Sequence, residues 1–215
     1  MISLYDYELS GNCYKVRLLL HWLGLEYTRI PVDFHPGREH QSPAFLDMVN
    51  PLGQLPVLQD GDFRLRDAQA ILVYLASQYD TNQYWYPSDA RVRGNITLWL
   101  TVAEQLNHTA AAARLQRSFG YAGDSAACQQ GANAVLRQLD DQLAEQHFQG
   151  RHWLAAEHPT IADIACFPYS ALAGEAGLDL IGFPALRQWI DAMRHQPGFI
   201  TMPGILAVCF AKMLT

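Results

Sequence analysis

Positive charge is scarce in this sequence. Lysine occurs only as Lys15 and Lys212, and Lys and Arg together number 15 against 21 Asp and Glu, which gives a net charge of -6. Nucleic acids and anionic membranes bind to basic protein surfaces. We therefore expect neither a nucleic acid nor a membrane as a partner.

Cysteine patterns typical of metal sites or disulfide scaffolds are also missing. The four cysteines lie far apart, without a Cys-x-x-Cys pair, at Cys13, Cys128, Cys166 and Cys209. The histidines are not clustered at ligand spacings. We expect free thiols, no bound metal and a cytoplasmic location. The start of the chain shows no signal-peptide pattern, and no apolar run is long enough to span a bilayer.

The first 80 residues alternate between strand and helix patterns. Ile2–Asp6 and Tyr27–Val32 are apolar or β-branched runs, and the apolar residues between them recur at helical spacing. This order predicts a right-handed βαβ unit with parallel strands. A short helix near residues 44–49, a hairpin with an Asp60-Gly61 turn and a helix over residues 67–79 follow. We therefore expect an α/β domain over residues 1–80.

The second half carries only helical patterns. A polar, proline-containing stretch at residues 81–89 is typical of a linker. Beyond it, apolar residues recur at helical spacing over residues 90–118, 125–148, 160–175 and 184–195. The sequence therefore predicts an all-helical bundle domain over residues 90–215.

Ser10 lies between the first strand and the first helix. Backbone N–H groups are unpaired there and the helix dipole favours an anion, so a hydroxyl at this place could donate a hydrogen bond to a thiolate. Alternatively, Ser10 is only an N-cap. Lys15, one turn further, either adds positive potential near such an anion or faces water, and Asn12 is either an N-cap or a contact of the thiol.

Four stretches together resemble the glutathione transferases, over nearly the whole chain. They are Ser10–Arg17, Asn50–Leu58, Leu65–Ile71 and Thr160–Asp163. The resemblance is to serine-type members of bacterial, zeta or nu character. It implies a thioredoxin-like N-terminal domain followed by an all-helical domain, and a homodimer. It also implies glutathione as co-substrate, a small electrophile as second substrate, and a role in detoxification.

The resemblance assigns catalytic roles within the first stretch. Ser10 activates the glutathione thiol, and Asn12 and Lys15 assist it. Cys13 offers a rival mechanism, because a cysteine at a helix N-terminus can be a reactive thiol. In the cysteine-type relatives, however, the nucleophile stands where Ser10 stands here, five residues before Lys15. Cys13 is therefore expected to pack into the domain.

The second and third stretches are assigned to glutathione binding. The resemblance implies a cis Leu55–Pro56 peptide and pairing of the Val57 backbone with the cysteinyl residue of glutathione. Gln54 either binds the glycine end or is an exposed loop residue. The polar loop at residues 35–41 is either a solvated face or the source of a cation for the glycine carboxylate, from His40 or Arg38.

The third stretch departs from the family pattern. Asp67 is expected to bind the α-amino group of the γ-glutamyl residue, either within its own subunit or across a dimer interface, although a carboxylate at a helix start is favoured for stability alone. The hydroxyl residue expected next is Ala68, which leaves only backbone N–H groups for the γ-glutamyl carboxylate.

The fourth stretch is a capping box, Thr160 to Asp163, which we interpret as structural. Four residues of the helical half, Glu104, His108, Phe119 and Tyr121, line either the second-substrate pocket or a dimer seam. The leading expectation is a glutathione transferase. Two alternatives are a zeta-type glutathione-dependent cis–trans isomerase and a non-catalytic module that binds a ligand or a partner.

Overall fold

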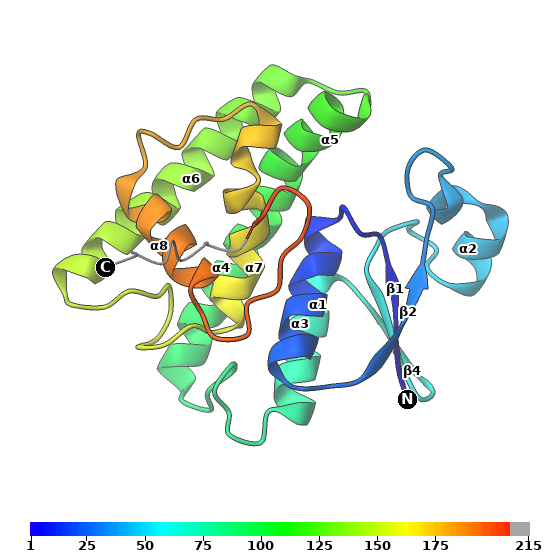
Figure 1. The fold of residues 1–215 in the computed structure, drawn as a ribbon, viewed down its shortest axis with the longest axis horizontal. Helices are drawn as coiled ribbons and strands as arrows, with labels where there is room; N and C mark the ends of the chain where they lie inside the picture. The colour runs from blue at the N-terminus through cyan, green and yellow to red at the C-terminus, as the bar shows by residue number, and fades with distance from the viewer. Residues whose placement is uncertain (207–215) are drawn as a thin grey trace, which may run out of the picture.

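The computed structural model describes residues 1–206 (Figure 1). Cys209, Lys212 and the last nine residues of the predicted helical domain lie outside the described residues. A sheet with its helices occupies one side of the molecule, and a group of helices occupies the other. This arrangement confirms the predicted fold class.

One mixed sheet organises the N-terminal part. Its strands are β1 (Ile2–Asp6), β2 (Tyr27–Pro31), β3 (Val57–Asp60) and β4 (Phe63–Arg66), in the order β2-β1-β3-β4. β1 pairs parallel to β2, as the βαβ prediction requires, while β3 pairs antiparallel to both β1 and β4. Two helices, α1 (Gly11–Trp22) and α3 (Ala68–Tyr79), lie between this sheet and the helical part. The N-termini of both helices therefore point to the same edge of the domain interface.

Two short helical segments follow β2 in the N-terminal part. The 3₁₀ turn η1 (Glu39–Gln41) and the short helix α2 (Pro43–Met48) form a lobe at the far side of the sheet in Figure 1. Ser42 caps α2 by accepting a hydrogen bond from the Phe45 backbone N–H. The chain returns from this lobe to β3 through the segment that contains Gln54.

The helical part begins at α4 (Ala90–Leu106), which continues through a π-helical turn, η2 (Asn107–Ala111), into α5 (Ala112–Phe119). The sequence predicted one helix over residues 90–118, and its side-chain pattern does not reveal the extra residue per turn that defines η2. The part is completed by α6 (Ser125–Phe148), α7 (Ile161–Ala171), the 3₁₀ turn η3 (Ala173–Ala176) and α8 (Pro184–Arg194).

α7 is the central helix of the molecule. Every residue from Ile161 to Ser170 is buried, and the helix packs against α1 and α3 on one side and α4 and α8 on the other. The predicted capping box at its start is present: Thr160 and Asp163 exchange hydrogen bonds. Both halves of the chain thus share one apolar core, which runs from Leu18 and Leu72 to Phe167 and Trp189.

Among residues 1–206, none of the helices is both long and apolar enough to cross a lipid bilayer. The same residues contain no group of three or more His, Cys, Asp or Glu side chains that could hold a metal ion.

Candidate active site

A cavity of about 350 Å³ opens where the N-termini of α1 and α3 meet the helices α4 and α5. Its volume falls within the range of small-molecule sites. Eight of the ten residues predicted for the site line it together: Ser10, Asn12, His40, Gln54, Leu55, Pro56, Asp67 and Ala68. The structure thus places in one cavity residues that lie up to 58 positions apart in the sequence.

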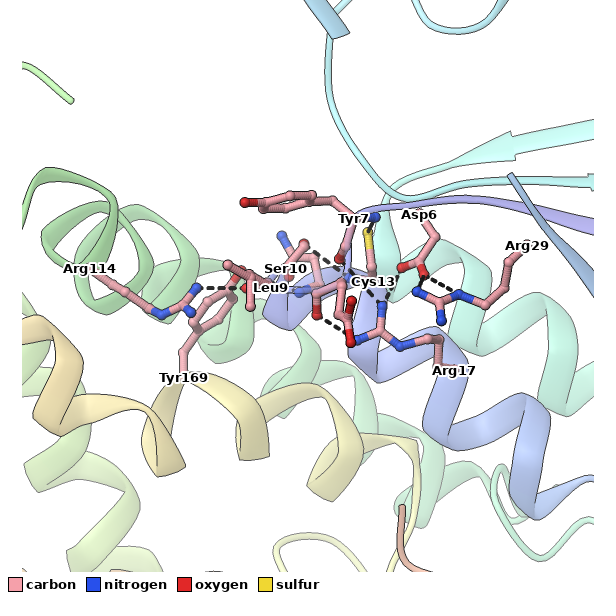
Figure 2. A network of polar contacts seen from close by, with 11 residues as sticks. Asp6, Tyr7, Leu9, Ser10, Cys13, Arg17, Arg29, Arg114 and Tyr169 are labelled. Atoms are coloured by element: carbon pink, nitrogen blue, oxygen red, sulfur yellow. Dashed lines mark hydrogen bonds and ion pairs between the residues drawn. The ribbon is translucent and has the colours of Figure 1, made fainter. Parts of the chain in front are cut away.

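A buried ion pair holds the turn that leads to Ser10. Asp6, at the end of β1, is 1% exposed and accepts hydrogen bonds from Arg17 and from Arg29, the latter at 2.7 Å. Arg17 also donates to the backbone carbonyl of Glu8 at 3.0 Å (Figure 2). The turn between β1 and α1 is therefore fixed to the helix that follows it.

Ser10 is the N-cap of α1. Its Oγ accepts a hydrogen bond from the Cys13 backbone N–H at 3.2 Å. The suggestion that Asn12 is the N-cap is therefore wrong, because Asn12 is the second residue of the helix. A hydroxyl that accepts in this way keeps its own proton for another partner. Ser10 can consequently cap the helix and donate to an anion in the cavity at the same time.

Cys13 packs inside the N-terminal domain, as predicted. Its side chain is fully buried and its Sγ accepts a hydrogen bond from the Tyr7 backbone N–H at 3.5 Å. Burial and the nearby Asp6 carboxylate raise the pKa of the Cys13 thiol to about 12. At neutral pH this thiol is protonated, which is the opposite of what a nucleophilic cysteine requires.

Lys15 does not face water. It is 0% exposed, and within residues 1–206 its Nζ atom has no hydrogen-bond partner. The ammonium lies 5.2 Å from the centre of the Tyr169 ring. Burial lowers the pKa of Lys15 to about 8, and the nearby Cys166, Glu104 and Asp67 partly oppose this effect. Lys15 lies behind the cavity wall and still carries a positive charge at neutral pH.

One wall of the cavity comes from the segment before β3. Gln54, Leu55 and Pro56 line it, and the Leu55–Pro56 peptide is cis, as the resemblance implies. Val57 begins β3 next to this wall, but it is fully buried and does not itself line the cavity. Gly53 has φ +59° and lies so close to the His40 carbonyl that a Cβ would come within 2.9 Å of that oxygen.

His40 lies against this wall but is poorly suited to be a cation. Its ring stacks on Phe34 at a centroid distance of 3.9 Å, and the side chain is 3% exposed. Burial, with a smaller effect of Arg38, lowers the pKa of His40. The lowered pKa disfavours a charged imidazole, so His40 is better suited to act as a neutral donor or acceptor. Arg38 lies over the Tyr121 ring and does not line the cavity.

Asp67 and Ala68 form the start of α3. Asp67 has φ +75° and ψ +125°, a backbone conformation that costs a non-glycine residue about 1–3 kcal/mol. Its carboxylate accepts a hydrogen bond from the Ala70 backbone N–H at 2.9 Å. Backbone strain of this kind concentrates at binding sites, and here it directs an acidic side chain to the edge of the cavity.

A chain of hydrogen bonds crosses from the N-terminal part to the helical part at the cavity floor. Asn12 Nδ2 donates to Asn107 Oδ1 at 3.0 Å, and Gln69 Nε2 donates to Glu104 Oε2 at 2.8 Å. Asn107 is the first residue of the π-helical turn η2 and also faces Glu104. These hydrogen bonds hold the Asn12 side chain against the helical part. Glu104 also pairs with His108 at 3.0 Å.

Two known family models match this chain. Residues 4–83 match the glutathione S-transferase N-terminal domain, and residues 111–197 match the C-terminal domain of the same family. Glutathione S-transferase 3 of Zea mays is 30% identical over 92% of this chain and 91% of its own length. The chain belongs to the glutathione S-transferase family.

Other members of the family differ in activity. Maleylacetoacetate isomerase of Pseudomonas aeruginosa is also 30% identical, over 92% of this chain and 93% of its own length. A solved glutathione S-transferase of Pseudomonas fluorescens superposes with a TM-score of 0.83 at 30% identity and covers 94% of this chain and 98% of its own. Membership of the family therefore determines the fold of this chain, whereas the reaction differs among members of the family.

Several cavity residues from the helical part escaped the sequence analysis, and two of them contact the Ser10 turn. Arg114 is buried, donates to Glu175 at 2.6 Å, and donates to the carbonyl of Leu9 at 2.8 Å. Tyr169 accepts a hydrogen bond from the Asn12 backbone N–H at 3.3 Å. Figure 2 shows both side chains reaching the Ser10 turn from the helical part. They lie more than a hundred residues from that turn, so no local pattern identifies them.

The remaining wall of the cavity is largely apolar and aromatic. Tyr7 stacks on Phe34 at a centroid distance of 5.4 Å, and both side chains line the cavity with Phe119. Glu104 and His108 also line it, whereas Tyr121 stacks behind Phe34 at 6.1 Å. Of the four residues of the helical half that the sequence analysis singled out, three therefore line the cavity and Tyr121 does not. An uncharged molecule bound next to Ser10 would contact this apolar surface.

Proposed function

We propose that this chain is a glutathione transferase in which Ser10 stabilises the thiolate of bound glutathione. The observation that carries the proposal is the position of Ser10, which caps α1 by accepting a hydrogen bond and lines the cavity. A hydroxyl that accepts in this way can still donate its proton to the thiolate. The thiol proton leaves to solvent, and the thiolate attacks an electrophile held against the apolar wall. A bond forms between the sulfur and the electrophile, whose leaving group departs.

The energy needed for this activation is within reach of the site. A free thiol has a pKa of about 8.5, and lowering it by about two units needs about 2.7 kcal/mol. A hydrogen bond to a charged acceptor contributes roughly 1.5–3 kcal/mol, and a helix N-terminus roughly 0.3–1 kcal/mol. Ser10 and the start of α1 therefore suffice, and Lys15 adds positive potential from behind the cavity wall.

The rest of the tripeptide is assigned to the other walls. We assign the cysteinyl backbone to Val57, the glycine end to Gln54 with His40 as a neutral partner, and the α-amino group to Asp67. Ala68 then offers only its backbone N–H to the γ-glutamyl carboxylate, at the N-terminus of α3, where an anion is favoured. Asn12 assists by holding the N-terminus of α1 against η2 through its hydrogen bond to Asn107.

Two variants test the mechanism. Ser10→Ala should lower turnover at least about tenfold at saturating glutathione, because the lost hydrogen bond to the thiolate is worth about 1.5 kcal/mol or more. Cys13→Ala should keep most of the activity with a general electrophilic substrate. An inactive Cys13→Ala protein beside an active Ser10→Ala protein would show that a thiol of the chain, and not the serine, carries the reaction.

A glutathione-dependent cis–trans isomerase is the second candidate, because the chain is as similar to a maleylacetoacetate isomerase as to a transferase. In that case glutathione adds to the double bond and leaves again, so no conjugate accumulates. Chromatography of reaction mixtures separates the two candidates: transfer consumes glutathione in proportion to product, whereas isomerisation leaves its concentration unchanged.

A further inference from the structure

Tyr169 lies against the N-terminus of α1. A Cβ added at Gly11 would come within 2.8 Å of the Tyr169 ring, so the glycine at the first position of the helix makes the space that the ring fills. The side chain is 6% exposed and lines the cavity beside Ser10. The aromatic ring is thereby fixed at the place where the proposed thiolate would form.

The hydroxyl of Tyr169 has defined partners. It accepts a hydrogen bond from the Asn12 backbone N–H at 3.3 Å. Burial raises the pKa of Tyr169 to about 12, while the nearby Arg114 and hydrogen bonds that involve Asn12 and Ser10 act in the opposite direction. The phenol is therefore protonated at neutral pH, and because its oxygen accepts from Asn12, its own proton remains to be donated to a further acceptor.

A serine hydroxyl offers two acceptor sites and one proton. In Ser10 the Cys13 backbone N–H occupies one acceptor site at 3.2 Å. We propose that Tyr169 is a positioning residue, whose hydroxyl donates to the second acceptor site of Ser10 and so directs the Ser10 proton to the sulfur of glutathione. This inference rests on the proposed function, because it assigns Tyr169 a role through Ser10 and no contact of its own with the sulfur.

Four proteins test the proposal: the wild type, Tyr169→Phe, Ser10→Ala and the double variant. Phenylalanine keeps the ring against Gly11 and removes only the hydroxyl. Tyr14→Phe is the matched control, since Tyr14 is also buried at α1 but donates to the Ile200 carbonyl at 2.6 Å, away from the cavity. The ultraviolet absorbance of the thiolate, followed against pH at saturating glutathione, gives the acid constant of the bound thiol.

We expect Tyr169→Phe to lower the acid constant of the bound thiol by about threefold to tenfold, the effect of one neutral hydrogen bond. The Tyr14→Phe protein should stay within about twofold of wild type. The decisive comparison is the double-mutant cycle: in the Ser10→Ala background, Tyr169→Phe should have no further effect. The glutathione affinity of Tyr169→Phe should change less than its thiol acid constant.

Two results would overturn the inference while leaving the proposed function intact. One is an unchanged acid constant in Tyr169→Phe. The other is an equal loss from Tyr169→Phe in both backgrounds, which would mean that Tyr169 donates to the sulfur directly. A Ser10→Ala protein with a wild-type acid constant, or a wild type that binds no glutathione, would instead refute the proposed function, and the inference would fall with it.

Discussion

Replacing Lys15 by methionine should make the protein more stable at neutral pH. The ammonium is fully buried and its Nζ has no hydrogen-bond partner within residues 1–206, so the folded chain carries a charge that has lost its hydration. Methionine has a similar length and a flexible, apolar end, and it fills irregular spaces well. The variant removes the charge and keeps most of the packing.

The magnitude follows from the pKa of Lys15, which is lowered from its ordinary value of 10.5 to about 8. Each unit corresponds to about 1.4 kcal/mol, so burial of the ammonium costs roughly 3 kcal/mol of stability. This cost already includes the opposing attraction of Glu104 and Asp67. For a chain of this length, Lys15→Met should raise Tm by several degrees, on the order of 5–10 °C.

The effect has a defined pH window. Below about pH 8 the folded chain holds the buried ammonium and pays the full cost. Between pH 8 and the ordinary pKa, the unfolded lysine still binds a proton that the folded one has released, so the stability of the wild type rises relative to the variant. The buried Cys13 thiol and the Tyr169 phenol titrate alike in both proteins, so their contributions cancel in the difference. Cys166 does not cancel completely, because Lys15 lowers the pKa of its thiol in the wild type.

Urea unfolding at pH 7 and at pH 10, followed by circular dichroism, measures this difference. We expect a gain of about 3 kcal/mol for Lys15→Met at pH 7 that becomes much smaller at pH 10. A variant less stable than the wild type at pH 7, or a gain independent of pH, would refute the idea of a costly buried charge. If Lys15 serves the thiolate, the more stable variant should also show a smaller thiolate fraction, which is the trade-off expected of a functional residue.

Three further predictions concern other parts of the molecule. Asp163→Ala should destabilise the fold by about 3–5 kcal/mol in urea unfolding, because it leaves the buried N–H donors of Thr160, Leu154 and Trp189 unpaired; a loss below 1 kcal/mol would contradict this. Calorimetry should show that Ala68→Ser binds glutathione about tenfold or more tightly and that Asp67→Ala binds it far more weakly; if Ala68→Ser binds no better, another group already holds the carboxylate. Light scattering at micromolar concentration should return twice the chain mass of 24.1 kDa, as the homodimer expected from the sequence requires, and a single chain mass would count against it.

Much of the fold could be predicted from local patterns. The strand Ile2–Asp6 and the hairpin around Asp60-Gly61 follow from alternation and turn chemistry, which depend on neighbours in sequence. The capping box at Thr160 is equally local. These elements lie where the sequence places them, because each is stabilised mainly by residues within a few positions of itself.

The parts that could not be predicted depend on contacts between distant segments. Lys15 stands on a helix at a position that could have faced water, and its burial results from the packing of distant segments, α7 among them, around α1. The lowered pKa of His40 depends on its burial, in a place where its ring stacks on Phe34. Tyr169 reaches the Ser10 turn across 157 residues, and the π-helical turn that brings Asn107 to Asn12 leaves no periodic signal.

The fit between Gly11 and Tyr169 has a consequence for how such chains can diversify. The two residues belong to different halves, and any side chain at position 11 would collide with the ring. A chimera that joins the first half of this chain to the second half of a relative would inherit one member of the pair without the other. Exchange of whole halves between relatives should therefore preserve folding more often than it preserves the site, and successful recombinants should carry a compatible pair at these two positions.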